Sequence, residues 1–214
     1  MTEQNFEQMR RAMVVSQLRT TGVNDPRVVT AMGEIARERF VPDDKVVLAY
    51  ADLALPIGVG RALNPPMVTG RLLTEAQVTP GDTALVVGAA TGYTVALLEK
   101  LGASAVAVEE DAGLYELGSK NVPGATWVKA PLVTGSKEGA PYSLILLDGA
   151  VEEIPQALID QLGDGGRLVG ALIDRGVSRL VLGVRAGRGF GTKSFADADA
   201  AHLPGFAKPA AFSF

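Results

Sequence analysis

The chain has 214 residues, 47% apolar and 21% charged, which suits a folded domain with a full core and argues against disorder. Its formal net charge is -4 and it has no basic stripe, so non-specific nucleic-acid binding is not expected. The absence of cysteine and the single histidine exclude thiolate catalysis and the common Cys and multi-His metal sites, so no metal site is expected. The start of the chain lacks a signal-peptide core, and no apolar run reaches the length of a membrane span. We therefore expect a cytoplasmic protein that does not enter a membrane.

The first eighty residues are predicted to be mainly helical. Apolar residues recur at helical spacing from 6 to 14 and predict a first helix. The tripeptide Asn24-Asp25-Pro26 is typical of a helix start, with a capping side chain before a proline in the first turn. The segment 40–66 is rich in proline and glycine and is expected to be irregular. Asn64 before two prolines predicts a cap for a third helix that carries Met67 to Ala76.

The pattern changes after the turn at Pro80-Gly81-Asp82, where short apolar strands alternate with helices. Uninterrupted apolar runs are typical of strands buried on both faces, so the alternation predicts a doubly wound, Rossmann-like parallel sheet. The expected strands cover 83–87, 105–109, 125–129, 143–148 and 167–173, and the expected helices cover 93–101, 114–120 and 154–162.

The end of the chain is predicted to differ from the rest of the sheet. Residues 178–185 and 190–195 form two strands separated by a tight turn, which predicts an antiparallel hairpin at the sheet's edge. Phe206, Phe212 and Phe214 indicate a final packed segment. No linker separates the helical region 1–80 from the sheet region 81–214, so we expect one structural unit.

Two features of the sheet region point to a nucleoside ligand. The loop Gly88-Ala89-Ala90-Thr91-Gly92 connects the first strand to its helix, where glycines let a ligand approach the backbone and the helix offers free N–H groups. Glu109 ends the second strand, where a carboxylate can accept hydrogen bonds from ribose hydroxyls. Each feature also has a purely structural interpretation: close packing for the loop, and helix-start acidity for Glu109 within Glu109-Glu110-Asp111.

At this point the chain resembles the protein-L-isoaspartate O-methyltransferase family. The similarity extends over most of the chain and lies in the order and spacing of several motifs. The matching segments are Arg37–Pro42, Ala49–Asp52, Leu55–Gly58, Leu85–Tyr93, Glu152–Leu162 and Gly165–Val169. The resemblance implies a Rossmann-like methyltransferase sheet, S-adenosylmethionine as cofactor and isoaspartyl-containing proteins or peptides as methyl acceptors.

The resemblance also implies roles for particular residues. Gly88, Ala90, Thr91, Gly92 and Glu109 would bind the cofactor. Asp52 and Asn64 would serve the isoaspartyl site as catalytic residues. The alternatives are that Asp52 caps local turns, which is equally plausible, and that Asn64 caps the next helix, which is the favoured interpretation of that residue. Asp148, at the end of the fourth strand, is expected either to face the ligand crevice or to cap a helix near Glu152.

The residue types present in the chain are compatible with methyl transfer. Methyl transfer to a carboxylate needs no histidine or cysteine, because the attacking oxygen is already ionised at neutral pH and catalysis consists mainly of alignment.

Several positions depart from the family pattern. Ala90 replaces the middle glycine of the loop, where a methyl group crowds a ligand or forces a positive φ on alanine. Val86 replaces a carboxylate, Ala62 and Asn64 replace hydroxyl residues, and Lys129-Ala130-Pro131 replaces an acidic turn. Two hypotheses remain: an isoaspartyl methyltransferase, or a non-catalytic relative that acts as a binding or regulatory module. A nicotinamide-dependent oxidoreductase is a weaker third, because the loop lacks Gly-x-Gly-x-x-Gly spacing.

Overall fold

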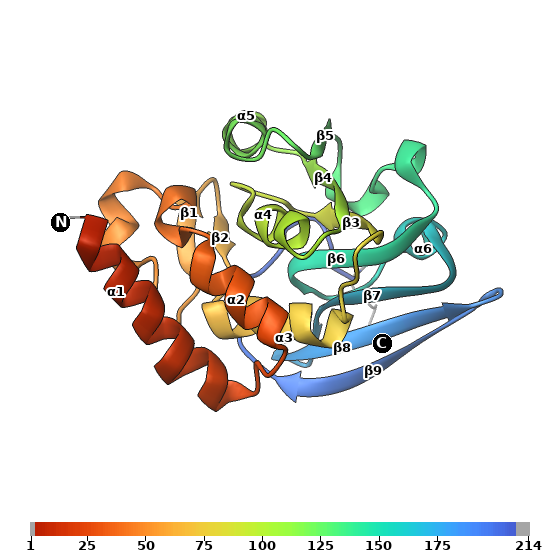
Figure 1. Cartoon of the computed structure of the whole chain (residues 1–214). Helices are drawn as coiled ribbons and strands as arrows, with labels where there is room; N and C mark the ends of the chain where they lie inside the picture. The colour runs from red at the N-terminus through yellow and green to blue at the C-terminus, as the bar shows by residue number, and fades with distance from the viewer. Residues whose placement is uncertain (1–2, 209–214) are drawn as a thin grey trace.

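The computed structural model describes residues 3–208 and contains a seven-stranded mixed sheet covered on both faces (Figure 1). The strand order is β5-β4-β3-β6-β7-β8-β9. The strands are β3 (Thr83–Val87), β4 (Ser104–Glu109), β5 (Thr126–Lys129), β6 (Tyr142–Val151), β7 (Leu162–Asp174), β8 (Val177–Ala186) and β9 (Gly189–Asp197). The first five strands in this order, from β5 to β7, pair in parallel. Strands β7, β8 and β9 form an antiparallel meander. The predicted doubly wound sheet with a C-terminal antiparallel hairpin is confirmed.

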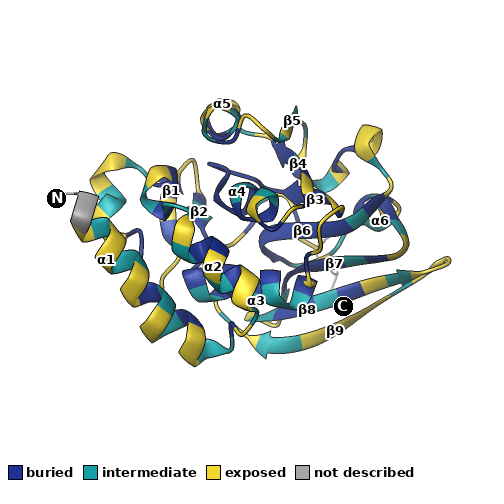
Figure 2. Cartoon of the chain, in the orientation of Figure 1, coloured by how far each residue is buried: buried dark blue, intermediate teal, exposed yellow. Residues whose placement is uncertain are grey.

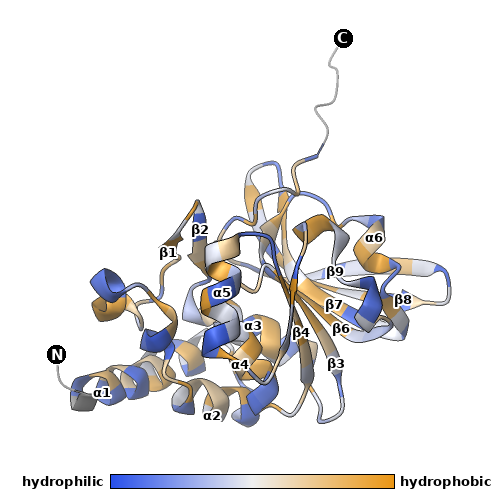
Figure 3. Ribbon diagram, turned by 90° about the horizontal axis from the view of Figure 1, so that it is seen from above, coloured by the Kyte–Doolittle hydropathy of each residue, from blue (hydrophilic) through white to orange (hydrophobic). Residues whose placement is uncertain are grey.

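Alternate residues of the central strands supply two separate cores. In β3, Ala84 and Val86 face one core, while Leu85 and Val87 face the other. All four are buried, which explains why the strand reads as an uninterrupted apolar run. Figure 2 shows the buried residues concentrated in the middle strands, and Figure 3 shows the same strands as the most hydrophobic part of the sheet.

The larger core lies between the sheet and the N-terminal helices. These are α1 (Glu3–Met13), the π-helical turn η1 (Val14–Leu18), the 3-10 turn η2 (Arg19–Thr21), α2 (Pro26–Glu34) and α3 (Pro66–Ala76). Helix α4 (Tyr93–Lys100) and helix α5 (Ala112–Asn121) cover the same face. The predicted start of α2 is confirmed, because the Asp25 carboxylate accepts a hydrogen bond from the backbone N–H of Arg27 ahead of Pro26 at the first turn.

The smaller core lies on the opposite face. It packs η5 (Leu132–Thr134), α6 (Gln156–Ile159) and the segment that follows β9 against the sheet. Leu203 and Phe206 of that segment are buried there, which confirms a packed segment for Phe206, whereas Phe212 and Phe214 lie outside the described residues. No helix within residues 3–208 has the length and hydrophobicity to cross a membrane.

Two expectations about local structure are wrong. The helix predicted over 154–162 is only the single turn α6, because β7 already begins at Leu162 to pair with β6. The segment 40–66 is not wholly irregular. After the 3-10 turn η3 (Arg37–Phe40), it contains the 3-10 turn η4 (Asp43–Leu48) and then a small antiparallel hairpin of β1 (Leu55–Gly58) and β2 (Arg61–Leu63). This hairpin carries Arg61 toward the main sheet.

Candidate functional site

The candidate site is the crevice at the carboxyl ends of β3 and β4. Strand β3 pairs in parallel with β4 on one side and with β6 on the other, so the order of strands reverses here, and such folds place their ligand crevice at this point. Gly88 leaves β3 at a φ of +78°, and the backbone N–H groups of Gly88 and Ala89 both donate to the Val108 carbonyl. This turn holds the loop 88–92 directly beside the end of β4.

Glu109 points into this crevice, as predicted, but its carboxylate oxygens already have several donors. Oε2 accepts from the Ala90 backbone N–H at 2.8 Å, and Oε1 accepts from the N–H groups of Glu110 and Asp111 at 3.0 and 3.2 Å. The side chain has 0% exposure. The helix-capping role belongs to its neighbour Asp111, which accepts from Leu114 at the start of α5.

Arg61 completes the environment of Glu109. Its Nη1 lies 2.8 and 3.0 Å from the two carboxylate oxygens, and its Nη2 donates to the Gly88 carbonyl at 2.9 Å. The guanidinium is only 4% exposed. Both members of this ion pair are therefore removed from water, and the hydrogen bonds to Glu109 compensate for part of the desolvation cost.

The segment after β9 fills the rest of the crevice. A Cβ atom placed on Gly88 would lie 2.5 Å from Cδ1 of Leu203 and 3.0 Å from Nη2 of Arg61. The space that a glycine at this turn leaves for a ligand is therefore filled by the protein's own side chains.

A nucleoside ligand does not fit this conformation. Arg61 uses the Glu109 oxygens that ribose hydroxyls would need, and Leu203 covers the glycine that a ligand backbone would approach. The loop and the carboxylate that the resemblance assigns to S-adenosylmethionine lie side by side, but Arg61 and Leu203 fill the space between and above them.

The loop residues predicted to bind cofactor divide into two groups. Ala90 lies beside Glu109 and adopts a φ of +51°, so of the two consequences considered for an alanine here the structure shows the positive φ. The Thr91 hydroxyl instead donates to the Phe40 carbonyl at 2.7 Å. A side chain at Gly92 would meet Val122 on the α5 side. The structure thus brings Gly88, Ala90 and Glu109 together. Thr91 and Gly92 instead contact the η3 turn and the end of α5.

Asn64 does not cap α3, which corrects the capping prediction. The N-cap residue of α3 is Pro65, which makes no side-chain hydrogen bond to the helix. Both ends of the Asn64 amide have partners outside α3. Its Nδ2 donates to Oδ1 of Asp148 at 2.9 Å, and its Oδ1 accepts from the Ala201 backbone N–H at 2.9 Å. Asn64 therefore links the approach to α3, the end of β6 and the segment after β9.

Asp148 faces the same buried crevice rather than a helix start. The next helix along the chain, α6, begins after Pro155 without a side-chain cap, so Asp148 does not cap it. Burial raises the pKa of the Asp148 carboxyl above its ordinary value, and hydrogen bonds from Thr94 and Asn64 only partly offset this effect. The buried polar cluster of the crevice thus consists of two carboxyl groups, one guanidinium and one amide.

Asp52 lies outside this cluster, on the exposed approach to α3. Its Oδ1 accepts a hydrogen bond from the Met67 backbone N–H at 3.0 Å, in the first turn of α3. The structure therefore shows the capping interaction that was one of the two alternatives for Asp52. A role of Asp52 toward the isoaspartyl methyl acceptor stays a prediction.

Replacing Asp52 with alanine is expected to cost about 1 kcal/mol of stability, because one N–H at the start of α3 loses its acceptor. Asp52→Asn keeps an oxygen at this place and should cost less than half as much. Urea unfolding of the three proteins measures the difference. Equal stabilities for the wild type and Asp52→Ala would contradict the capping role.

The Arg37–Pro42 motif builds the wall behind the crevice. The buried guanidinium of Arg37 donates from Nε to the Ala49 carbonyl at 2.8 Å and from Nη2 to the Asn64 carbonyl at 2.7 Å. It also lies over the Tyr93 ring, 4.7 Å from its centroid. This motif fixes the backbone of Asn64 and, through Phe40, the loop 88–92.

Sequence reasoning missed two residues of the crevice, Arg61 and Leu203. Arg61 carries a detectable signal, since it is the only charged residue between Leu53 and Met67. Leu203 has no such signal, because its position depends on the path of the chain after β9.

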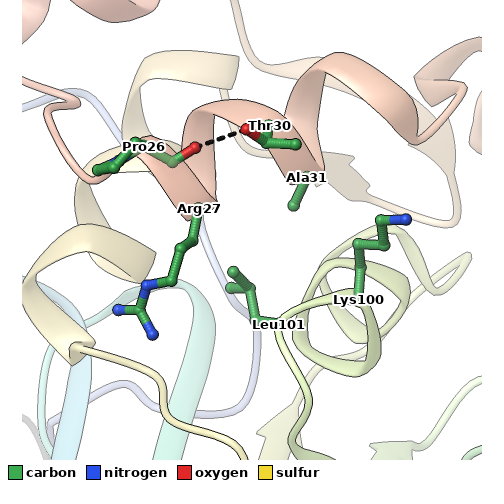
Figure 4. Close-up of a pocket in the computed structure, with 6 residues that line it drawn as sticks. All are labelled: Pro26, Arg27, Thr30, Ala31, Lys100 and Leu101. Carbon is green, nitrogen blue, oxygen red and sulfur yellow. Dashed lines mark hydrogen bonds between the residues drawn. The ribbon is translucent and has the colours of Figure 1, made fainter.

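An open surface hollow lies elsewhere, between α2 and α4, with a volume of about 340 Å³ (Figure 4). Its lining includes none of the predicted site residues; it is formed by Pro26, Arg27, Thr30, Ala31, Lys100 and Leu101. The Arg27 guanidinium is already paired with Asp25 and with the Val78 carbonyl, and Lys100 is paired with Glu34. This hollow offers no unpaired charged group for a ligand and is not the candidate site.

The fold is that of Rossmann-like methyltransferases. A solved protein-L-isoaspartate O-methyltransferase superposes with a TM-score of 0.80 at 20% identity, over 92% of this chain and 66% of that longer one. A second, a β-aspartate methyltransferase from Plasmodium falciparum in complex with S-adenosyl-L-homocysteine, gives a TM-score of 0.77 at 17% identity. That match covers 91% of this chain and 97% of the other.

The sequence narrows this class to one family. Residues 9–188 match the family model of protein-L-isoaspartate(D-aspartate) O-methyltransferase (PCMT). Protein-L-isoaspartate O-methyltransferases of Koribacter versatilis and Methanoculleus marisnigri are 39% and 38% identical, over 75% and 80% of this chain and 74% and 80% of theirs. The chain belongs to the protein-L-isoaspartate O-methyltransferase family of S-adenosylmethionine-dependent methyltransferases.

Proposed function

We propose that this protein transfers a methyl group from S-adenosylmethionine to the carboxylate of isoaspartyl residues in damaged proteins or peptides. The observation that carries the proposal is the family match along residues 9–188, combined with Glu109 at the end of β4 beside the loop 88–92. The missing histidine and cysteine in this crevice do not weaken it, because the acceptor carboxylate is ionised at neutral pH. The closed crevice of the present conformation has to open for this reaction.

A second candidate is favoured by that closed crevice itself. If the Arg61–Glu109 ion pair never opens, the chain is a non-catalytic member of its family that keeps the fold as a binding or regulatory module. The buried ion pair and the apolar cover from Leu203 support this alternative. The two candidates differ in whether a nucleoside enters at all.

Methyl transfer to a defined peptide tests the proposal. The protein is incubated with S-adenosylmethionine labelled in its methyl group and with a synthetic peptide that contains one isoaspartyl residue. The matched control is the same peptide with an ordinary aspartate at that position. We expect label in the isoaspartyl peptide alone. No label above the protein-free blank, at any protein concentration, contradicts the proposed function and leaves the second candidate.

A further inference from the structure

We propose that Arg61 and residues 198–206 form an intramolecular plug that keeps the cofactor crevice closed, and that a nucleoside ligand binds only when the plug withdraws. The inference rests on the proposed function, since it assigns a form of regulation to the same site. It concerns two segments that lie far apart in the sequence and meet over Gly88.

The first part of the plug substitutes for a ligand's polar groups. The Arg61 guanidinium donates to both Glu109 oxygens and to the Gly88 carbonyl, and it is 4% exposed. A carboxylate at the end of the second strand of such a sheet ordinarily receives ribose hydroxyls. Arg61 therefore satisfies the same acceptor from within the chain, and ligand and guanidinium compete for it.

The second part of the plug covers the apolar side of the crevice. Residues 198–206 run alongside β6, where the Ala150 N–H donates to the Ala201 carbonyl at 2.7 Å and the Leu203 N–H donates to the Ala150 carbonyl at 2.9 Å. A Cβ atom on Gly149 would lie 2.7 Å from the Ala201 oxygen, so the glycine permits this close approach. Leu203 is thereby held over Gly88 with 1% exposure.

Asn64 connects the two parts of the plug. It lies one residue beyond β2, the strand that carries Arg61, and its Oδ1 accepts from the Ala201 N–H. Movement of β2 and release of the segment after β9 are therefore coupled through a single amide side chain.

The hairpin that carries Arg61 is built to move more easily than the main sheet. Its two strands have four and three residues and form a separate sheet, and two-stranded hairpins are marginally stable on their own. Its tip, Gly58-Val59-Gly60, has three successive positive φ angles, and at Val59 a φ of +46° is unfavourable for a β-branched side chain. Val59 is 66% exposed, so no packing compensates for the strain. Withdrawal of the hairpin removes Arg61 from Glu109.

A closed plug lowers the apparent affinity for a nucleoside by the fraction of molecules that are open. Variants that weaken the plug should therefore bind the same ligand more tightly. Arg61→Ala removes the competing guanidinium, and Leu203→Ala removes the cover over Gly88 without leaving a buried charge. Arg179→Ala is the matched control, because Arg179 of β8 is 42% exposed and pairs with Asp174 and Asp197 on the neighbouring strands, away from the crevice.

Titration calorimetry with S-adenosylhomocysteine, which cannot donate a methyl group, measures the effect on the folded proteins. We expect Arg61→Ala and Leu203→Ala to bind at least tenfold more tightly than the wild type, with Arg179→Ala unchanged. A thermal melt checks that each variant is folded, and Leu203→Ala alone decides the test if Arg61→Ala is not. Affinities equal to or below that of the wild type overturn the plug.

The same proteins separate this inference from the proposed function. Tight ligand binding by Leu203→Ala, with no methylation of the isoaspartyl peptide by either the wild type or Leu203→Ala, leaves the plug intact and refutes the function. A wild type that binds as tightly as the variants and methylates the peptide supports the function and refutes the plug.

Discussion

Replacing Arg61 with alanine is expected to lower the free energy of unfolding of the free protein by about 3 kcal/mol. The reason is the partner left behind: Glu109 stays buried with its charge and loses both bonds from the guanidinium. Three backbone N–H groups still donate to the carboxylate, which keeps the loss at the lower end of the range for broken buried pairs. Urea unfolding measures the change.

The exposed Arg179 again provides the control for this prediction. Arg179→Ala should change stability by less than about 0.5 kcal/mol, because exposed ion pairs contribute little. A double-mutant cycle with Arg61→Ala and Glu109→Gln should give a coupling energy above about 1 kcal/mol, as expected for residues in direct contact. A loss below 1 kcal/mol in Arg61→Ala, or no coupling, shows that the pair is not buried as described.

The second large effect is expected at the opposite end of the sheet, in Asp82→Asn. The Asp82 carboxylate accepts from Nη2 of Arg167 at 2.6 Å, from Oγ of Ser143 at 2.7 Å and from the Thr79 N–H at 2.7 Å. Asp82 is 6% exposed and Arg167 is 20% exposed. Because this pair retains some contact with water, we expect a loss of about 2 kcal/mol at neutral pH, below the range for fully buried pairs.

The loss in Asp82→Asn should depend on pH. Burial of Asp82 acts to raise its pKa, but the hydrogen bonds from Arg167, Ser143 and Thr79 outweigh burial and bring the pKa well below its ordinary value. A carboxyl whose pKa is lowered on folding contributes stability above its unfolded pKa and loses that contribution as the pH falls toward the folded value. The stability difference between wild type and variant should therefore shrink below about pH 4, by about 1.4 kcal/mol per pH unit. A difference that is constant or grows in acid contradicts this assignment.

The sheet was predictable because its signals are local. The run Leu144 to Leu147 is apolar on both faces of β6, and the expected bounds of β3 agree with the structure residue for residue. The antiparallel β8–β9 hairpin was also predictable, since a short glycine-containing turn separates its two strands in the sequence. In the structure Gly187 of this turn adopts a φ of +59°. Alternation of strands and helices then determines the topology by general connection rules.

The closed crevice was not predictable because its contacts join distant parts of the chain. Arg61 and Glu109 are 48 residues apart, and Asn64 and Ala201 are 137 apart, so no local pattern records either contact. The β1–β2 hairpin was hidden in a segment whose prolines and glycines indicate irregular structure. The residues of the loop 88–92 and Glu109 were found from their spacing, but what covers them depends on tertiary packing alone.

The central claim is that residues 198–206 and Arg61 close the crevice in the free protein. Hydrogen–deuterium exchange of peptides that cover residues 198–206 tests it most directly, because the Ala201 and Leu203 N–H groups donate to Asn64 and Ala150. We predict slow exchange in the free protein and faster exchange in the presence of saturating S-adenosylhomocysteine. Rapid exchange of this segment without ligand, or protection that increases with ligand, would contradict the account.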